Sequence, residues 1–258
     1  MIIQDDTPEP SVTPPVYPCC PPCNLLGTTE ELFPRNFFAF EGIDGAGKTT
    51  LIDEVTHQLS MSGRGVTVIA LKSVGVVTHA LERAKWLNAD PLSINLLNWV
   101  ALVENTLSIR SLLNRRDHIV IADRYTLTVK VRGMLEGLDP AHSACLETYV
   151  PSPQEIFLID AAPEECVRRI ATGGRRISYF EAGFRDVDAL GSPMIEHAHS
   201  ERVTAVNRTA ALGLHLNRSR ELFLRLSKND ARVSLVANSS CARETAASIA
   251  NSILGQQA

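Results

Sequence analysis

The stretch FFAFEGIDGAGKTTLIDEV, residues 37–55, decides the fold of this chain. An apolar run leads into a glycine-rich segment, which a lysine, two threonines and an amphipathic stretch follow. The segment from Gly42 to Thr49 fits the pattern G-x-x-x-x-G-K-[ST], in which glycines let the backbone turn tightly and point its N–H groups at phosphate oxygens. The sequence therefore predicts a strand over residues 36–41, a phosphate-binding loop (P-loop), and a helix after the lysine.

A chain of phosphates is the ligand that this pattern indicates, because the backbone N–H groups and the positive end of the helix both favour anions. Lys48 is expected to reach the β- and γ-phosphates, and the Thr49 hydroxyl to bind Mg²⁺. ATP and Mg²⁺ are therefore the predicted cofactors. The alternatives are a chance glycine turn and a loop that binds nucleotide without turnover. The residues predicted to bind ATP here are Gly42, Gly45, Ala46, Gly47, Lys48, Thr49 and Thr50.

Short apolar runs alternate with helical patterns along the rest of the chain. HIVIAD and EIFLID are continuously apolar and each ends in aspartate, which is typical of strands buried on both faces of a parallel sheet. Strand–helix alternation of this kind predicts an α/β fold, a doubly wound parallel sheet of five strands flanked by helices. The expected strands cover residues 36–41, 66–71, 118–123, 155–160 and 232–237.

Capping residues predict where several helices begin and end. Asp90 followed by Pro91 is a cap with proline at the first helical position, and it opens a long helix to about Leu113. Pro163 opens another helix, with acids in its first turn, and Gly173 ends it. A last helix is expected over residues 246–253.

The composition excludes several function classes. With 258 residues, 45% hydrophobic and 21% charged, the chain has the composition of an ordinary globular protein. A net charge of −4 gives no general basic surface for nucleic acid. No apolar run has the ~18–20 residues of a membrane helix, and the N-terminus lacks a secretory pattern, so we expect a cytoplasmic protein.

The first 33 residues differ from the rest, because seven of the 14 prolines fall within the first 22 positions. Proline fixes φ and removes a donor, so we expect a disordered proline-rich arm over residues 1–33, with partner docking as the alternative. The six cysteines are expected to be free thiols. One C-x-x-C pair within CCPPC is a weaker candidate for a metal site, because no second pair of ligands is nearby.

The sequence ADRY, residues 122–125, follows the third predicted strand. In doubly wound sheets the carboxyl ends of the strands face the ligand crevice, so Asp123 and Arg124 should lie beside the phosphates. Asp123 is suited to hold Mg²⁺ through water or to accept a hydrogen bond from substrate, and Arg124 to grip a phosphoryl group with two donors. The alternative is a structural ion pair at the strand end.

These segments together resemble the thymidylate kinase family of nucleoside monophosphate kinases. The resemblance rests on FFAFEGIDGAGKTTL, IVIADRY and FLIDAAPEECVRRIATGGRR, and it covers roughly residues 36–254. It implies transfer of the γ-phosphoryl group of ATP to a nucleoside monophosphate, with dTMP as the leading acceptor and dTDP as product. It also implies that Asp44 holds the sugar 3′-hydroxyl and that Arg124 holds the acceptor phosphate. Family members are commonly homodimers, and the helix from Pro91 either supplies such a face or is buried within one subunit.

The resemblance also implies a lid around residues 172–190 within a kinase domain that spans residues 34–258. In RRIATGGRRISYF two arginine pairs flank two glycines, which give hinge freedom so that closure brings positive charge onto the transferring group. Arg175 is the leading prediction for the catalytic arginine, with Arg169 and Arg176 as the next candidates. Arg169 and Arg176 are also predicted to bind ATP, and the alternative is a solvated basic helix end. The predicted catalytic residues are Lys48, Arg124, Arg175 and Asp44.

The base-reading part of the chain departs from the family. Lys72 stands in the segment LKSVGVVTH where the family has an arginine, and Trp99 is placed either to stack on a base or to pack in the core. The acceptor could therefore be dTMP read differently, another nucleotide, a deoxynucleoside or a phosphorylated metabolite, and a catalytically weak nucleotide-binding protein is a further alternative. The predicted substrate-binding residues are Asp44, Lys72, Trp99, Asp123, Arg124 and Tyr125, and the predicted metal ligands are Thr49 and Asp123.

Overall fold

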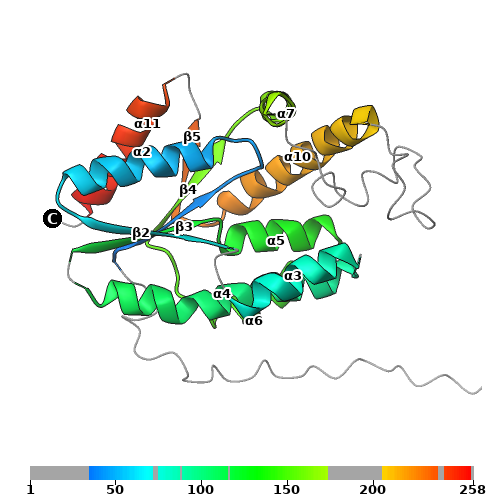
Figure 1. The fold of residues 1–258 in the computed structure, drawn as a ribbon, viewed down its shortest axis with the longest axis horizontal. Helices are drawn as coiled ribbons and strands as arrows, with labels where there is room; N and C mark the ends of the chain where they lie inside the picture. Colours follow the sequence, from blue (N-terminus) through cyan, green and yellow to red (C-terminus); the bar gives the residue numbers. More distant parts are fainter. Residues whose placement is uncertain are drawn as a thin grey trace, which may run out of the picture.

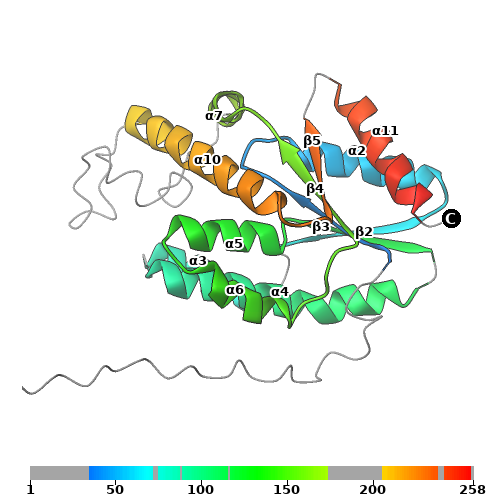
Figure 2. The same ribbon diagram turned by 180° about the vertical axis from the view of Figure 1, so that it is seen from behind.

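The computed structural model describes residues 35–71, 75–87, 89–115, 117–173, 205–237 and 241–256. Within these ranges, five parallel strands form one sheet, and helices cover both of its faces (Figures 1 and 2). The predicted fold class is confirmed. The strand order is β2-β3-β1-β4-β5, with β1 (Phe37–Glu41), β2 (Gly65–Ala70), β3 (His118–Asp123), β4 (Glu155–Asp160) and β5 (Val233–Ala237).

The three inner strands carry the apolar core. All five residues of β1 are buried, and so are the middle residues of β3 and β4, as their continuous apolar runs predict. The two outer strands β2 and β5 are partly exposed, because each has a neighbour on one side only. Phe37 meets Tyr125 edge to face, with ring centroids 5.1 Å apart, and this contact ties β1 to the loop after β3.

Two of the predicted helices have the bounds that their caps indicated. The side chain of Asp90 accepts a hydrogen bond from the N–H of Ser93 at 2.9 Å and so caps α4 at its start. The helix that opens at Pro163 ends before Gly173. The helices are α2 (Lys48–Met61), α3 (Val76–Trp86), α4 (Pro91–Leu113), α5 (Thr126–Leu135), α6 (Pro140–Glu147), α7 (Pro163–Thr172), α10 (Ala205–Ser227) and α11 (Ala242–Gly255).

The sheet topology brings the carboxyl ends of β1 and β3 side by side. These strands are neighbours, with Phe40 opposite Asp123 in the register. The chain leaves β1 for α2 on one face of the sheet and leaves β3 for α5 on the other face (Figure 1). Because the two connections diverge, the loops that begin them are the place where a doubly wound sheet binds ligands.

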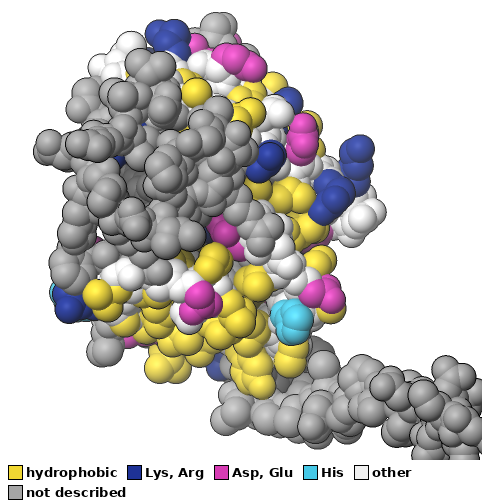
Figure 3. All heavy atoms as spheres, turned by 90° about the vertical axis from the view of Figure 1, so that its right-hand side faces the viewer, with side chains coloured by type: hydrophobic (Ala, Val, Ile, Leu, Met, Phe, Trp, Pro, Cys, Tyr) yellow, Lys and Arg dark blue, Asp and Glu magenta, His cyan; other side chains and the backbone are white. Residues whose placement is uncertain are grey.

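Helix α4 presents an apolar stripe to the outside of the molecule. Five large hydrophobic side chains, spaced three or four residues apart, are between 43% and 76% exposed: Leu92, Leu96, Val100, Val103 and Leu107. Figure 3 shows hydrophobic side chains gathered over the lower part of one face, where α3 and α4 lie in Figure 1. Contiguous exposed apolar surface of this kind is typical of a protein–protein contact.

Candidate functional site

The loop between β1 and α2 is shaped by three glycines with positive φ. Gly42, Gly45 and Gly47 have φ values of 133°, 79° and 90°, which side chains with a Cβ rarely adopt. A Cβ on Gly42 would lie 2.5 Å from the carbonyl oxygen of Ile159, and one on Gly45 would lie 2.9 Å from that of Cys166. The loop therefore lies directly against the end of β4 and the start of α7.

Lys48 folds back over this loop. Its side chain is 5% exposed, and its Nζ donates to the carbonyl oxygens of Gly42 at 2.9 Å and Ile43 at 2.7 Å. Burial, together with the positive charge of Arg124, lowers the pKa of Lys48 to about 7. A bound phosphate would offset both effects, so the ammonium is held where anionic oxygens would stabilise it.

This depressed pKa makes the stability of the ligand-free protein depend on pH. Between pH 7 and pH 9 the unfolded chain keeps the lysine proton, since its ordinary pKa is 10.5, whereas the folded chain loses it. The unfolded state then binds more protons, so Lys48 should make the free energy of unfolding rise by about 2 kcal/mol over this window, a gain that is lost as the pH falls again to 7. Urea unfolding of the natural protein and of Lys48→Met, each at pH 7 and pH 9, measures this change in the free energy of unfolding. An equal pH dependence in the two proteins would contradict the prediction.

Arg124 lies beside the loop in an unusual backbone conformation. Its φ is 69°, a left-handed value that costs a non-glycine residue about 1–3 kcal/mol and persists only where the surroundings enforce it. Its Nη1 donates to the carbonyl oxygen of Gly42 at 3.1 Å, and its Nη2 forms an ion pair with Asp44. The Arg124 charge holds the pKa of Asp44 well below its usual range. Lys48, Asp44 and Arg124 therefore meet at one edge of the sheet.

Asp123, one residue earlier, ends β3 on the same edge. Its charge acts on Lys48, whose pKa it raises against the effect of burial, so the two side chains lie within electrostatic reach. Thr49 and Thr50 are exposed at the start of α2. Lys48 and Asp123 thus lie near each other, and Thr49 follows Lys48 at the start of α2. That Thr49 and Asp123 hold a metal stays a prediction.

Glu41 is a buried acid that the sequence analysis does not single out. It is 0% exposed, and its carboxylate accepts hydrogen bonds from the N–H groups of Tyr125 at 2.9 Å and Thr128 at 3.0 Å, and from the Thr128 hydroxyl. Burial raises the pKa of Glu41, and these hydrogen bonds oppose the rise. A charged residue at the end of an otherwise apolar strand is the signal in the sequence that could have identified it.

Helix α7 brings one arginine onto the loop. Arg169 Nη1 donates to the carbonyl oxygen of Gly45 at 3.3 Å, and its Nε donates to Glu165 at 2.8 Å. Glu165 also accepts from Arg168, and hydrogen bonds from the two guanidinium groups lower its pKa to about 2. Arg169 therefore lies next to the predicted phosphate loop. The other predicted residues Lys72, Arg175 and Arg176 lie outside the described residues, as do the proposed lid beyond Gly173 and the arm over residues 1–33.

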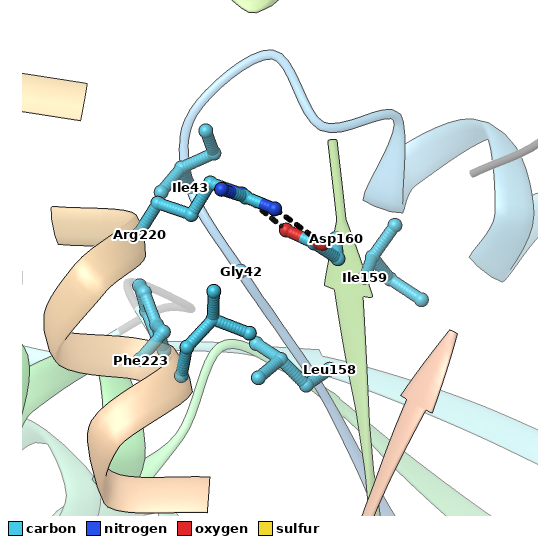
Figure 4. A pocket seen from close by; sticks show the side chains of 8 residues that line it. Gly42, Ile43, Leu158, Ile159, Asp160, Arg220 and Phe223 are labelled. Atoms are coloured by element: carbon cyan, nitrogen blue, oxygen red, sulfur yellow. Dashed lines mark hydrogen bonds and ion pairs between the residues drawn. The ribbon is translucent and has the colours of Figure 1, made fainter. Parts of the chain in front are cut away.

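Behind the loop, an ion pair joins α10 to β4 (Figure 4). Arg220 donates to Asp160 through Nε at 2.6 Å and Nη2 at 2.8 Å. Beside the pair, a small pocket of about 10 Å³, enough for roughly one water molecule, lies between Gly42 and Phe223. The pair braces the strand end against which Gly42 packs. The sequence pattern does not reveal it, because its partners are 60 residues apart.

Two aromatic residues predicted to bind substrate are buried. Trp99 is 2% exposed within the hydrophobic core, and Tyr125 is 2% exposed with its hydroxyl donating to the carbonyl oxygen of Pro151 at 2.9 Å. The burial of Trp99 agrees with the alternative that this side chain packs in the core. That either ring contacts a substrate stays a prediction.

Other features of the described residues bear on metals and membranes. Cys145, Cys166 and Cys241 are free thiols, and this part of the chain contains no group of three or more metal-binding side chains. No helix in it combines the length and hydropathy that a membrane-spanning helix requires. The CCPPC segment lies outside the described ranges.

The chain is similar in sequence to known thymidylate kinases. The family model described as Thymidylate kinase matches residues 40–207. The chain is 31% identical to the probable thymidylate kinase of Sulfurisphaera tokodaii over 134 residues, which cover 52% of this chain and 68% of that protein. It is 28% identical to the thymidylate kinase of Polaromonas sp. over 217 residues, which cover 73% of this chain and 96% of that protein.

Proposed function

Because the chain belongs to the thymidylate kinase family, we propose that it transfers the γ-phosphoryl group of ATP to the phosphate of dTMP and so forms dTDP. The observation that carries the proposal is the meeting of two cationic groups at one edge of the sheet. Arg124 Nη1 lies 3.1 Å from the carbonyl oxygen of Gly42, in the same loop that Lys48 bonds. Two phosphate groups bound there would lie next to each other, as phosphoryl transfer requires.

The residues on the donor side fit ATP. The loop glycines leave backbone N–H groups without Cβ atoms in the way, and Lys48 supplies a positive charge that is already confined to the loop. Arg169 supplies a guanidinium group beside Gly45 as a second positive charge on this side. Thr49 and Asp123 are the residues that would hold Mg²⁺ together with the phosphates. When bound, Mg²⁺ neutralises charge that develops on the phosphates during transfer.

The residues on the acceptor side fit a phosphate and a hydroxyl group. The Arg124 guanidinium presents several donors in one plane, which match a phosphate dianion. Asp44, whose pKa is held low by Arg124, stays ionised at neutral pH and can accept a hydrogen bond from a sugar hydroxyl. Arg124 and Asp44 form an ion pair, so an acceptor nucleotide would exchange this pair for contacts with its own groups.

Arg124→Ala tests the acceptor side directly. We expect the KM for dTMP to rise and kcat to fall, with kcat/KM about 10²-fold lower, because a partly buried charge-assisted contact to the phosphate is lost. The affinity for Mg·ATP, measured by calorimetry, should change by less than about threefold. A variant that loses affinity for ATP alone would show that Arg124 serves the donor phosphates instead.

The proposed activity is tested by offering Mg·ATP with a panel of nucleoside monophosphates, nucleosides and phosphorylated metabolites while ADP release is followed. Lys48→Ala is the control for turnover at this site. Preference for dTMP supports the proposal, whereas turnover of unphosphorylated nucleosides alone would make the protein a nucleoside kinase. Binding of ATP without turnover of any acceptor would make it a nucleotide-binding protein.

We also propose that the apolar stripe of α4 is the contact between two subunits of a homodimer. Pairing would remove Leu96, Val100 and Leu107 from water, each worth about 1.5 kcal/mol or more when fully buried. Sedimentation should give a dimer for the natural protein and a monomer for Val100→Glu, which places a charge within the stripe. A charge placed on α11 at the exposed residue Ser248 is the matched control. A natural protein that stays monomeric at high concentration would rule the contact out.

A further inference from the structure

Helix α5 begins without a capping side chain of its own. Its N-cap residue is Tyr125, whose side chain makes no capping hydrogen bond and instead reaches Pro151. The first N–H groups of a helix have no partner within the helix and usually take one from a Ser, Thr, Asp or Asn at the N-cap. The start of α5 must therefore be stabilised from elsewhere.

Glu41, at the end of β1, supplies the missing cap. One carboxylate oxygen accepts the N–H of the N-cap residue Tyr125 at 2.9 Å and that of the N3 residue Thr128 at 3.0 Å, while the other accepts the Thr128 hydroxyl. In a capping box two side chains within the helix satisfy these same two N–H groups. Here a single acid from strand β1 satisfies both N–H groups, and its negative charge lies at the positive end of the helix.

The same contacts fix the residue before the cap. Arg124 donates its N–H to the carbonyl oxygen of Phe40 at 3.0 Å, and the next N–H in the chain, that of Tyr125, is held by Glu41. The backbone on both sides of Arg124 is therefore bonded to consecutive residues of β1. Between these two anchors Arg124 takes its left-handed φ of 69°, which turns its guanidinium toward Gly42 and Asp44.

We propose that Glu41 is a positioning residue for Arg124: it caps α5 from β1 and so holds the turn that directs the Arg124 guanidinium to the acceptor phosphate. Glu41 is 0% exposed, so it acts through Arg124 rather than directly on a substrate. Because β1 continues into the phosphate loop at Gly42, one strand sets the positions of both phosphate-binding groups. This inference rests on the proposed function only for the role of Arg124 in binding the acceptor phosphate. The contacts that hold Arg124 in place do not depend on the proposed function.

The test is a double-mutant cycle between Glu41→Ala and Arg124→Ala, with the acceptor that the natural protein turns over. Glu41→Ala should raise the acceptor KM about tenfold or more and leave the affinity for Mg·ATP within about threefold, as Arg124→Ala does. In the Arg124→Ala background, Glu41→Ala should raise the acceptor KM by less than about twofold, because the guanidinium that Glu41 positions is already absent. Losses that multiply independently would overturn the proposal.

Two further variants separate positioning from stability. Glu41→Gln keeps an acceptor oxygen for both N–H groups and should restore the acceptor KM to within about threefold. Asp139→Ala removes the cap of α6, where Asp139 accepts the N–H of Ala141 at 2.8 Å, and should lower stability with no change in KM. If Glu41→Ala, like Asp139→Ala, lowers stability and leaves the acceptor KM unchanged, Glu41 has only a structural role. Thr128→Val, which removes one donor to Glu41, serves if Glu41→Ala does not fold, and it too should raise the acceptor KM.

A crystal structure of Glu41→Ala, or of Thr128→Val in its place, tests the inference without any activity. Arg124 should leave the left-handed region, and its guanidinium should move away from Gly42. An unchanged Arg124 would overturn the inference even in an active kinase. Absence of turnover in the natural protein, with Arg124 displaced in the variant, would instead overturn the proposed function and leave the positioning role standing.

Discussion

Lys48→Met is expected to lower kcat/KM for Mg·ATP by about 10²–10³-fold, the usual effect of removing one donor that stabilises charge in a transition state. The lysine lies 2.7 and 2.9 Å from two loop carbonyl oxygens and so places a positive charge directly against the loop backbone. Methionine has a similar length and no charge, so it removes the ammonium while it keeps most of the packing. Steady-state kinetics with varied ATP measures the loss.

Lys228→Met is the matched control, because Lys228 is exposed just beyond the end of α10. It should leave both rate and stability unchanged. The Lys48 variant should unfold at no lower denaturant concentration than the natural protein at pH 7, since a buried charge is removed with the side chain. A Lys48→Met protein that keeps near-normal turnover would place the triphosphate somewhere other than this loop.

Gly42→Ala is expected to lower the free energy of unfolding by about 4 kcal/mol or more, which is a large share of the total for a domain. The added Cβ would lie 2.5 Å from the carbonyl oxygen of Ile159, a backbone atom in β4 that cannot move without disturbing the sheet. The φ of 133° adds strain for any residue other than glycine. Urea unfolding followed by circular dichroism measures the loss.

Gly63→Ala separates strain from collision. Gly63 also has a positive φ, 80°, but a Cβ there would meet nothing within 4 Å. Gly63→Ala should lower the free energy of unfolding by only about 1–2 kcal/mol, which is the cost of a left-handed conformation. Equal losses for the two variants would mean that the close approach of Gly42 to β4 is not tight in solution.

Local patterns were sufficient to predict the elements that local residues determine. The glycine pattern predicts the loop, and the pair Asp90-Pro91 predicts the first residue of α4, because both depend on neighbours within a few positions. The rule that ligands bind at the carboxyl ends of parallel strands places Arg124 beside Gly42, as the structure shows.

Long-range contacts explain what the sequence could not predict. Helix α5 has no cap signal of its own, because its cap is Glu41, 84 residues before Tyr125. In the same way α10 and β4 are joined by Arg220 and Asp160. Helix α4 is apolar on several sides, so its sequence cannot show that Trp99 faces the core while Leu107 faces outward.

The self-contained bonding of Lys48 has a consequence for selectivity. The ammonium has two oxygen partners within the loop, so an anion that binds there competes with the carbonyl groups of Gly42 and Ile43. An anion with few oxygens, such as inorganic phosphate or sulfate, gains little from that exchange. A triphosphate offers further oxygens to the backbone N–H groups along the loop, so these two lysine contacts favour a triphosphate over small anions.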